Sequence, residues 1–200
     1  MKSYQYWLLV VGLTVYVGAL GVLTADNVFH LRLFPPKLDR MIATDIGKLG
    51  STDKKVIKAA QDEIVAYHEF SIPPLIRALK RGDAQQKPLC AECLHQIAGK
   101  YFLSGADYGT DAAAWDQWWS IEQAIDGLRD DRPSAREAAK AEIASYGRAA
   151  IPVLIDTLRD PSQRVRVLAA ETLAKITGQD LGLEREKWLA WWKAQEGRNQ

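Results

Sequence analysis

The chain has 200 residues, of which 26 are Lys or Arg and 25 are Asp or Glu, so its formal net charge is +1. This balance gives no support for a protein that binds nucleic acid or attracts acidic substrates. The length allows one domain of ordinary size plus an anchor, and an apolar content of 48% is sufficient for a packed core.

The first predicted element is a membrane-spanning helix. Residues 6–23 (YWLLVVGLTVYVGALGVL) carry no charge, and a run of this length is at the short end of what crosses a bilayer. Tyr6 and Trp7 at its start are typical of aromatic residues at a membrane interface. A cleaved signal peptide ending near Ala19 or Ala25 is the alternative, and we expect a retained anchor.

Basic residues near the anchor bear on which side of the membrane the domain occupies. Lys2 precedes the anchor, whereas Arg32, Lys37 and Arg40 come after it. The nearest charge and the simple count therefore favour opposite orientations. A very short basic tail resembles a bacterial signal anchor that exports the domain attached to it, so we expect a periplasmic domain, with a cytoplasmic one as the alternative.

Residues 24–37 form an apolar linker that ends in Pro35 and Pro36, which block a helix. Two of its apolar residues are Phe29 and Phe34. Either the linker packs on the first repeat, or these side chains contact the membrane surface or a membrane partner. The sequence favours neither interpretation over the other.

The rest of the chain is an internal duplication. The stretch Ile72–Trp119 recurs as Ile151–Trp192, and the match extends backward without a gap to Ile42 and Ile121. The period of about 79 residues suits two helical hairpins, so we predict an all-α solenoid of about four hairpins. Repeat pair 1 covers residues 38–120 and repeat pair 2 covers residues 121–200. Apolar spacing, first-turn prolines and terminal glycines predict helices near residues 38–49, 53–67, 72–81, 87–98, 112–128, 133–146, 149–159, 163–177 and 184–195.

Two segments of the second copy carry a family resemblance. Residues 160–173 (DPSQRVRVLAAETL) resemble the second half of a HEAT repeat, and residues 130–143 (DDRPSAREAAKAEI) resemble the repeat before it. The resemblance covers most of residues 38–196 and is to HEAT and PBS-lyase HEAT-like repeats, whose bacterial members carry a similar tail with a WxxWW motif. It implies an α-solenoid whose function the motif does not specify.

The same resemblance implies a polar ladder between repeats. In HEAT repeats an Asp in the turn and an Arg on the second helix often link neighbouring repeats, and here these are Asp160 with Arg166 and Asp130 with Arg136. The first copy departs from the pattern, because its equivalent pairs are Ser51 with Ile57 and Arg81 with Lys87. This departure suggests that the first copy has diverged for a contact of its own.

Cys90 and Cys93 form a CxxC motif. Pro88 predicts that a helix starts there, with both thiols in its first turn, where helix polarity lowers a thiol pKa. A thiol-redox role or a disulfide is therefore one interpretation. The duplicate positions hold Ala169 and Thr172, on the core-facing side of a helix, which favours cysteines that simply fill the core.

Six tryptophans lie in two WxxWW clusters. Trp115, Trp118 and Trp119 of the first cluster recur in the second copy at residues 188, 191 and 192. Aromatic residues at this spacing cover one helix face. Because the clusters are duplicated, we expect most of these side chains to be structural.

The two copies differ most by an insertion. Residues 100–106 (KYFLSGA) have only Gln179 as their counterpart. Loops that grow on one face of a repeat array often form its binding face. The alternative is a loop whose aromatic side chains pack back onto its own repeats. The predicted partner-binding residues are Tyr101, Phe102, Leu103 and Tyr108 of this region, with Phe29 and Phe34 of the linker.

No residue pattern indicates an active site. His30, His68 and His95 have no neighbouring Ser or Cys in a triad order, and no spacing makes His68 or His95 a zinc ligand. No Gly-rich phosphate loop and no isolated pair of carboxylates is present. We therefore expect a protein that is not an enzyme and has no catalytic residues, cofactor or metal.

Together these features predict a membrane-anchored scaffold for protein–protein interaction. We expect an accessory or assembly subunit of a larger membrane complex, such as a respiratory or photosynthetic one, that contacts lipid through residues 6–23 and binds no nucleic acid. The alternatives are a thiol-redox protein that uses Cys90 and Cys93, and a structural homo-oligomer built by stacking repeat ends.

Overall fold

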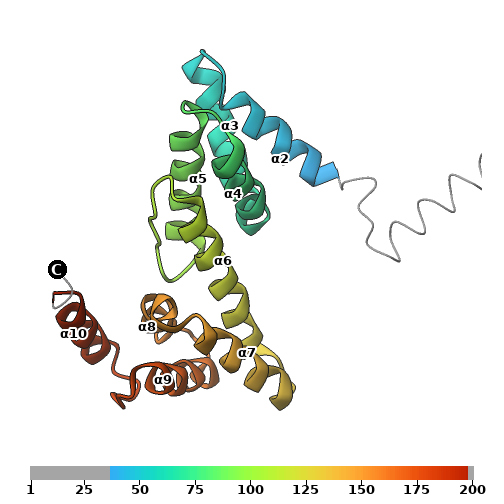
Figure 1. Cartoon of the computed structure of the whole chain (residues 1–200). Coiled ribbons are helices and arrows are strands. Elements are labelled where there is room, and N and C mark those ends of the chain that lie inside the picture. The colour runs from blue at the N-terminus through green and yellow to red at the C-terminus, as the bar shows by residue number, and fades with distance from the viewer. Residues whose placement is uncertain (1–36, 198–200) are drawn as a thin grey trace, which may run out of the picture. The chain divides into compact units, whose positions relative to one another are not determined.

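The computed structural model describes residues 37–197, and the regular structure within that range is entirely helical (Figure 1). The chain divides into two units, residues 1–43 and residues 44–200, and helix α2 (Lys37–Lys48) spans the boundary. The predicted membrane helix at residues 6–23 lies outside the described residues, as do Phe29 and Phe34. Within residues 37–197, none of the helices is both long and apolar enough to cross a membrane.

The first copy packs three helices around a short 3₁₀ segment. Asp53 caps the first of these helices by accepting a hydrogen bond from the Lys55 amide at 2.8 Å. The buried hydroxyl of Ser71 donates to the carbonyl of Ile64 at 2.7 Å and ties the 3₁₀ segment to the same helix. The elements are α3 (Lys54–Ala66), η1 (His68–Ser71), α4 (Ile72–Arg81) and α5 (Gln86–Tyr101).

The second copy repeats this arrangement. Helix α8 packs on α9 as α4 packs on α5, and α7 packs on α9 as α3 packs on α5. Gly178 ends α9 in the left-handed region, with φ of 70°, where a residue without a Cβ is favoured. The elements are α7 (Pro133–Ser145), η3 (Gly147–Ala150), α8 (Ile151–Thr157) and α9 (Gln163–Thr177).

Helix α6 (Ala112–Asp126) belongs to both copies. Its first half carries the first tryptophan cluster and packs on α4, and the helix also contacts α7 and α8 of the second copy. Helix α10 (Arg185–Glu196) is the counterpart of that first half and packs on α8. The 3₁₀ segment η2 (Gly127–Arg129) leads from α6 into the turn before α7. The shared helix α6 therefore joins the two copies into one stack.

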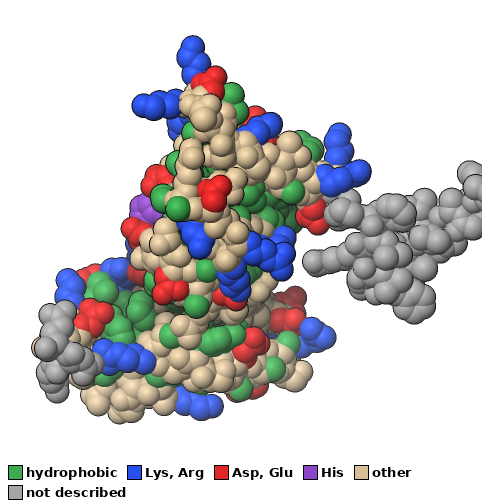
Figure 2. All heavy atoms as spheres, turned by 45° about the horizontal axis from the view of Figure 1, so that its top comes forward, with side chains coloured by type: hydrophobic (Ala, Val, Ile, Leu, Met, Phe, Trp, Pro, Cys, Tyr) green, Lys and Arg blue, Asp and Glu red, His purple; other side chains and the backbone are tan. Residues whose placement is uncertain are grey.

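One apolar core runs through both copies, from Leu49 to Trp188. Its largest fully buried side chains include Trp115, Trp118 and Trp188. Because each hairpin contributes to a common core, none buries its apolar face alone, which is the behaviour of a repeat stack. On the face drawn in Figure 2, basic and acidic side chains are interspersed, in keeping with the balanced composition.

The predicted helices match the described ones within a few residues, with two exceptions. Helix α5 continues through Gly99 to Tyr101, whereas its counterpart α9 ends at Thr177 and is capped by Gly178. The insertion supplies further helical residues, so Gly99 lies inside a helix instead of capping one. The helix expected at residues 149–159 is divided into the end of η3 and the shorter α8. The all-helical stack supports the predicted α-solenoid.

Candidate interaction surface

In each copy, a buried tryptophan holds the turn that precedes its own helix, α6 in the first copy and α10 in the second. The indole nitrogen of Trp115 donates to the carbonyl of Gly109 at 2.8 Å, and that of Trp188 donates to Gly182 at 2.9 Å. The two glycines have φ of 51° and 62°, a region that glycine adopts without strain. The aspartate two residues before each glycine accepts its amide. This repeated turn confirms that the first tryptophan of each cluster is structural.

The insertion between α5 and α6 turns Phe102 inward. Its ring meets Trp118 edge to face, with centroids 5.2 Å apart, and Trp119 with centroids 5.8 Å apart. Such aromatic pairs stabilise a fold beyond the apolar area that they bury. Leu103 next to it is 40% exposed. Of these two predicted partner-binding residues, only Leu103 presents much of its side chain outward.

Tyr108 also packs on a tryptophan. Its ring meets Trp115 edge to face, with centroids 5.2 Å apart. Burial raises the pKa of the Tyr108 hydroxyl above its usual range. Phe102 of the insertion and Tyr108 just after it therefore both pack against tryptophans of their own copy.

The insertion provides a polar partner for the second tryptophan as well. The hydroxyl of Ser104 accepts a hydrogen bond from the indole nitrogen of Trp118 at 2.9 Å and donates one to Glu122 at 2.8 Å. Burial raises the pKa of Glu122, and its hydrogen bonds oppose that shift. The second copy has no insertion, and there the equivalent Trp191 is half-buried where Trp118 is buried.

The same loop reaches the second copy. The carbonyl of Leu103 accepts a hydrogen bond from the guanidinium of Arg159. Arg159 and Arg185 of α10 both pair with Asp156 of α8, at 3.5 and 2.7 Å. The insertion therefore helps to fix the spacing between the two copies, a structural role that the sequence pattern did not indicate.

The polar ladder differs in its details from the family pattern. Arg166 donates to the backbone carbonyls of Asp160 and Pro161, at 2.6 and 3.0 Å. The Asp160 carboxylate is buried, and it accepts the guanidinium of Arg129 and the amide of Ser162. The link between repeats is therefore Arg129 with Asp160, whereas Arg166 closes the turn that precedes its own helix.

The turn before α7 is closed in the same way as the turn before α9, by an arginine that donates to two backbone carbonyls. Arg136 donates to the carbonyls of Asp130 and Asp131, both at 2.8 Å. The Asp130 carboxylate accepts hydrogen bonds from Arg132, which lower its pKa to about 2. Asp130 and Arg136 are thus joined through the backbone and not through the carboxylate.

Cys90 and Cys93 are free thiols, both fully buried in α5. Their predicted place in the first turn is wrong, because α5 begins at Gln86, before Pro88. Burial raises the pKa of Cys90 to about 11 and that of Cys93 to about 12. A thiol that stays protonated is a poor nucleophile, so this environment favours core-filling cysteines over the thiol-redox alternative.

Sequence reasoning missed a surface at η1. His68 has φ of 55° where its duplicate, Gly147, has φ of 56°. The His68 ring stacks on Tyr101, with centroids 4.1 Å apart and planes at 22°. Phe70, whose duplicate is Ala149, is 58% exposed. We call the stacked His68 and Tyr101, with the exposed Phe70 of the same 3₁₀ segment, the aromatic ledge; comparing HEFS with GRAA in the aligned copies would have found its two η1 residues.

The ledge combines residues from two places where the first copy differs from the second. One is the replacement of small residues in the 3₁₀ segment by His68 and Phe70. The other is the extension of α5 by the insertion, which supplies Tyr101. The stacking of His68 on Tyr101 brings η1 and the extended end of α5 together.

The described residues show no grouping of metal ligands. Within residues 37–197, no three His, Cys, Asp or Glu side chains come together in a way that could hold a metal ion. The Nδ1 atom of His95 lies 3.3 Å from the carbonyl oxygen of Ala106, and the ring of His68 stacks on Tyr101 in the ledge.

The fold and these contacts define an α-solenoid of stacked helical hairpins. Residues 121–184 match the family model described as HEAT repeats. The matched range runs from the middle of α6 to the residue before α10, and it includes the Arg129–Asp160 link. The match supports a HEAT-repeat protein, and HEAT repeats generally mediate protein–protein interaction. No curated protein matches the chain.

Proposed function

We propose that this chain is a non-enzymatic, membrane-anchored scaffold, an accessory or assembly subunit of a larger membrane complex. The HEAT-repeat match supports the scaffold, and the uncharged run at residues 6–23 supports the anchor. The aromatic ledge is the observation that carries the proposal, because it gives the first copy a surface that the second copy lacks.

The ledge contains a strained residue, His68, and a largely exposed one, Phe70. A residue other than glycine in the left-handed region costs roughly 1–3 kcal/mol, and the second copy avoids this cost with Gly147. Phe70 leaves 58% of its surface in solvent. Aromatic side chains concentrate at the centres of protein interfaces, so binding of a partner accounts for both features.

The anchor and its orientation complete the proposal. Residues 6–23 hold the chain in the bilayer, and the repeats lie on the periplasmic side, as the very short basic tail favours. The partners are then membrane-complex subunits with exposed periplasmic segments, and a respiratory or photosynthetic complex is a suitable host. Deleting residues 6–23 should release the chain from carbonate-washed membranes, whereas retention would show that the anchor is wrongly assigned.

A native gel of gently solubilised membranes, probed for the full chain, tests the scaffold role. We expect the wild type to migrate with a large assembly and a Phe70→Ser variant to lose most of that migration. The matched Ala149→Ser variant changes the duplicate position and should migrate like the wild type. If the wild type migrates by itself, near the mass of about one or two chains, the scaffold role is rejected.

A further inference from the structure

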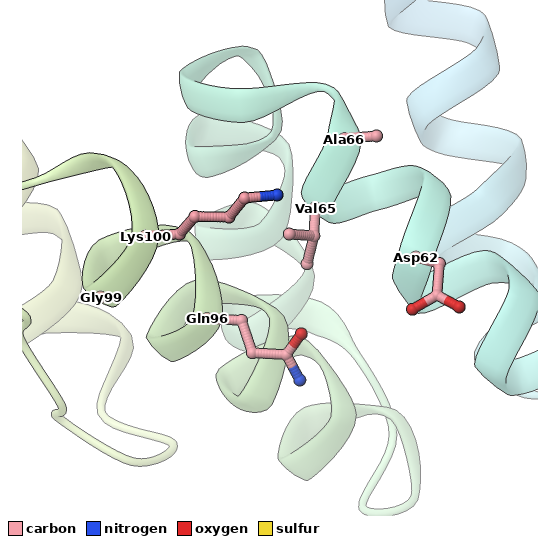
Figure 3. A pocket seen from close by; sticks show the side chains of 6 residues that line it. All are labelled: Asp62, Val65, Ala66, Gln96, Gly99 and Lys100. Atoms are coloured by element: carbon pink, nitrogen blue, oxygen red, sulfur yellow. The ribbon is translucent and has the colours of Figure 1, made fainter.

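An open groove lies between α3 and α5, near the C-terminal ends of both helices (Figure 3). Lys100 in its wall immediately precedes Tyr101, and Ala66 is followed by Tyr67 and His68, so each wall continues along the chain into one of the two stacked rings. Its volume is about 590 Å³, and it is lined by Asp62, Val65, Ala66, Gln96, Gly99 and Lys100.

The groove is lined by one basic residue, Lys100, and one acidic residue, Asp62. Figure 3 shows the Lys100 side chain reaching from α5 toward Val65 of α3. The Asp62 carboxylate already pairs with Lys58 at 2.8 Å. By contrast, Lys100 forms no ion pair with any residue from 37 to 197, and its Nζ lies 5.0 Å from the Tyr101 ring centroid. The group that complements the Lys100 ammonium is therefore a carboxylate.

Gly99 leaves part of the groove wall without a side chain. Glycine inside a helix is unfavourable relative to alanine, yet Gly99 lies within α5. A Cβ at this position would meet no atom within 4 Å, so packing inside the chain does not require glycine there. The open space allows the backbone of a bound segment to approach α5 closely.

We propose that this groove binds an acidic segment of a partner protein, with a carboxylate on Lys100 and an apolar side chain against Phe70 and Tyr101 of the ledge. This inference rests on the proposed scaffold function and names the chemistry of the partner. The unpaired ammonium selects an acidic segment over a basic one. The exposed aromatic surface selects a segment in which an apolar residue lies near the acidic one.

Selection from a library of short random peptides, using the purified full chain in detergent micelles, tests this chemistry. The library is first depleted on a Gly99→Leu variant, in which a side chain fills the groove. We expect the selected peptides to share an Asp or Glu close to an aromatic or aliphatic residue. A Lys100→Glu variant should bind them at least about tenfold more weakly.

Charge exchange provides the sharpest control. A selected peptide whose carboxylate is replaced by lysine should lose affinity for the wild type and bind the Lys100→Glu variant. The Gly99→Ala variant should melt no lower than the wild type yet bind less tightly, so that weaker binding is separated from unfolding. Variants at Glu171 of the second copy, such as Glu171→Lys, should leave the peptide affinity unchanged.

Several outcomes would overturn the inference. The selected peptides could be basic, could bind the Gly99→Leu variant as well as the wild type, or could ignore the charge exchange. If these outcomes appeared while the wild type still migrated with a large assembly, the groove assignment would fail and the scaffold role would stand. If the chain migrated by itself while the peptides behaved as expected, the groove would stand and the scaffold role would fail.

Discussion

Phe102 and Trp118 meet edge to face, with ring centroids 5.2 Å apart and planes inclined at 76°. This contact makes Phe102 part of the fold, although it lies in the insertion that distinguishes the two copies. A Phe102→Ser variant should therefore lose about 1–3 kcal/mol of unfolding free energy, measured by chemical denaturation. The neighbouring Leu103→Ser variant, at a 40% exposed position, should stay within about 0.5 kcal/mol of the wild type. Equal stability of the two variants would contradict this packing.

Substitutions at Asp160 and at Asp126 together test the link between repeats. Both carboxylates bind Arg129, but Asp160 is 1% exposed and the Asp126 side chain is 80% exposed. An Asp160→Ala variant leaves the part-buried amide of Ser162 without its acceptor and Arg129 without its buried partner, and should be destabilised by about 2–3 kcal/mol. An Asp126→Ala variant should change stability by less than about 1 kcal/mol, because solvent screens its ion pair. Thermal and denaturant unfolding of both variants decide the question, and similar losses would reject the link.

The buried thiols predict a loss of stability in alkali. Their pKa values in the folded chain, about 11 for Cys90 and about 12 for Cys93, lie above the ordinary thiol value. As pH rises from the ordinary value toward these values, the unfolded chain loses protons that the folded chain keeps, so folding stability falls. A variant with Cys90→Ala and Cys93→Thr, which copies the second repeat, should lose less stability over that range. Rapid alkylation of both native thiols near neutral pH would contradict their burial.

Glu122 gives a second pH dependence on the acid side. Burial raises its pKa, so the folded chain holds its proton to a higher pH than the unfolded chain does. The stabilisation from this group is complete below the ordinary carboxyl pKa and is lost as pH rises through the folded value. A Glu122→Gln variant should therefore gain stability relative to the wild type between pH about 4 and about 7. If the variant instead gained stability relative to the wild type as the pH fell, the pH dependence would have the opposite sign and this account would be rejected.

The tryptophan clusters and the helix order were predictable from sequence because both depend on local spacing and on the duplication. The direction in which the Phe102 side chain points could not be predicted from sequence. An aromatic residue in an inserted loop is compatible with packing inward or facing a partner, and only the position of Trp118 in space decides between them. The partner of Asp160 was likewise hidden, because Arg129 lies in the preceding repeat and the family pattern points to Arg166.

The aromatic ledge could have been predicted in part from sequence, by comparing the aligned positions at which the two copies hold different residues. Attention to matching positions passes over His68 and Phe70, since their duplicates are Gly147 and Ala149. The strain at His68 depends on a backbone angle, and its contact with Tyr101 depends on how far α5 extends beyond Gly99. Neither property can be read from residue spacing.

Photo-crosslinking in native membranes tests the central claim most directly, namely that the first copy carries the partner surface. A photoreactive phenylalanine analogue is placed at position 70 in one variant of the full chain and at position 149, its duplicate, in another. The account predicts a discrete crosslinked product from position 70, lost when Lys100→Glu is added, and no such product from position 149. Identical products from both positions, or none from position 70 while the chain still migrates in a large assembly, would contradict it.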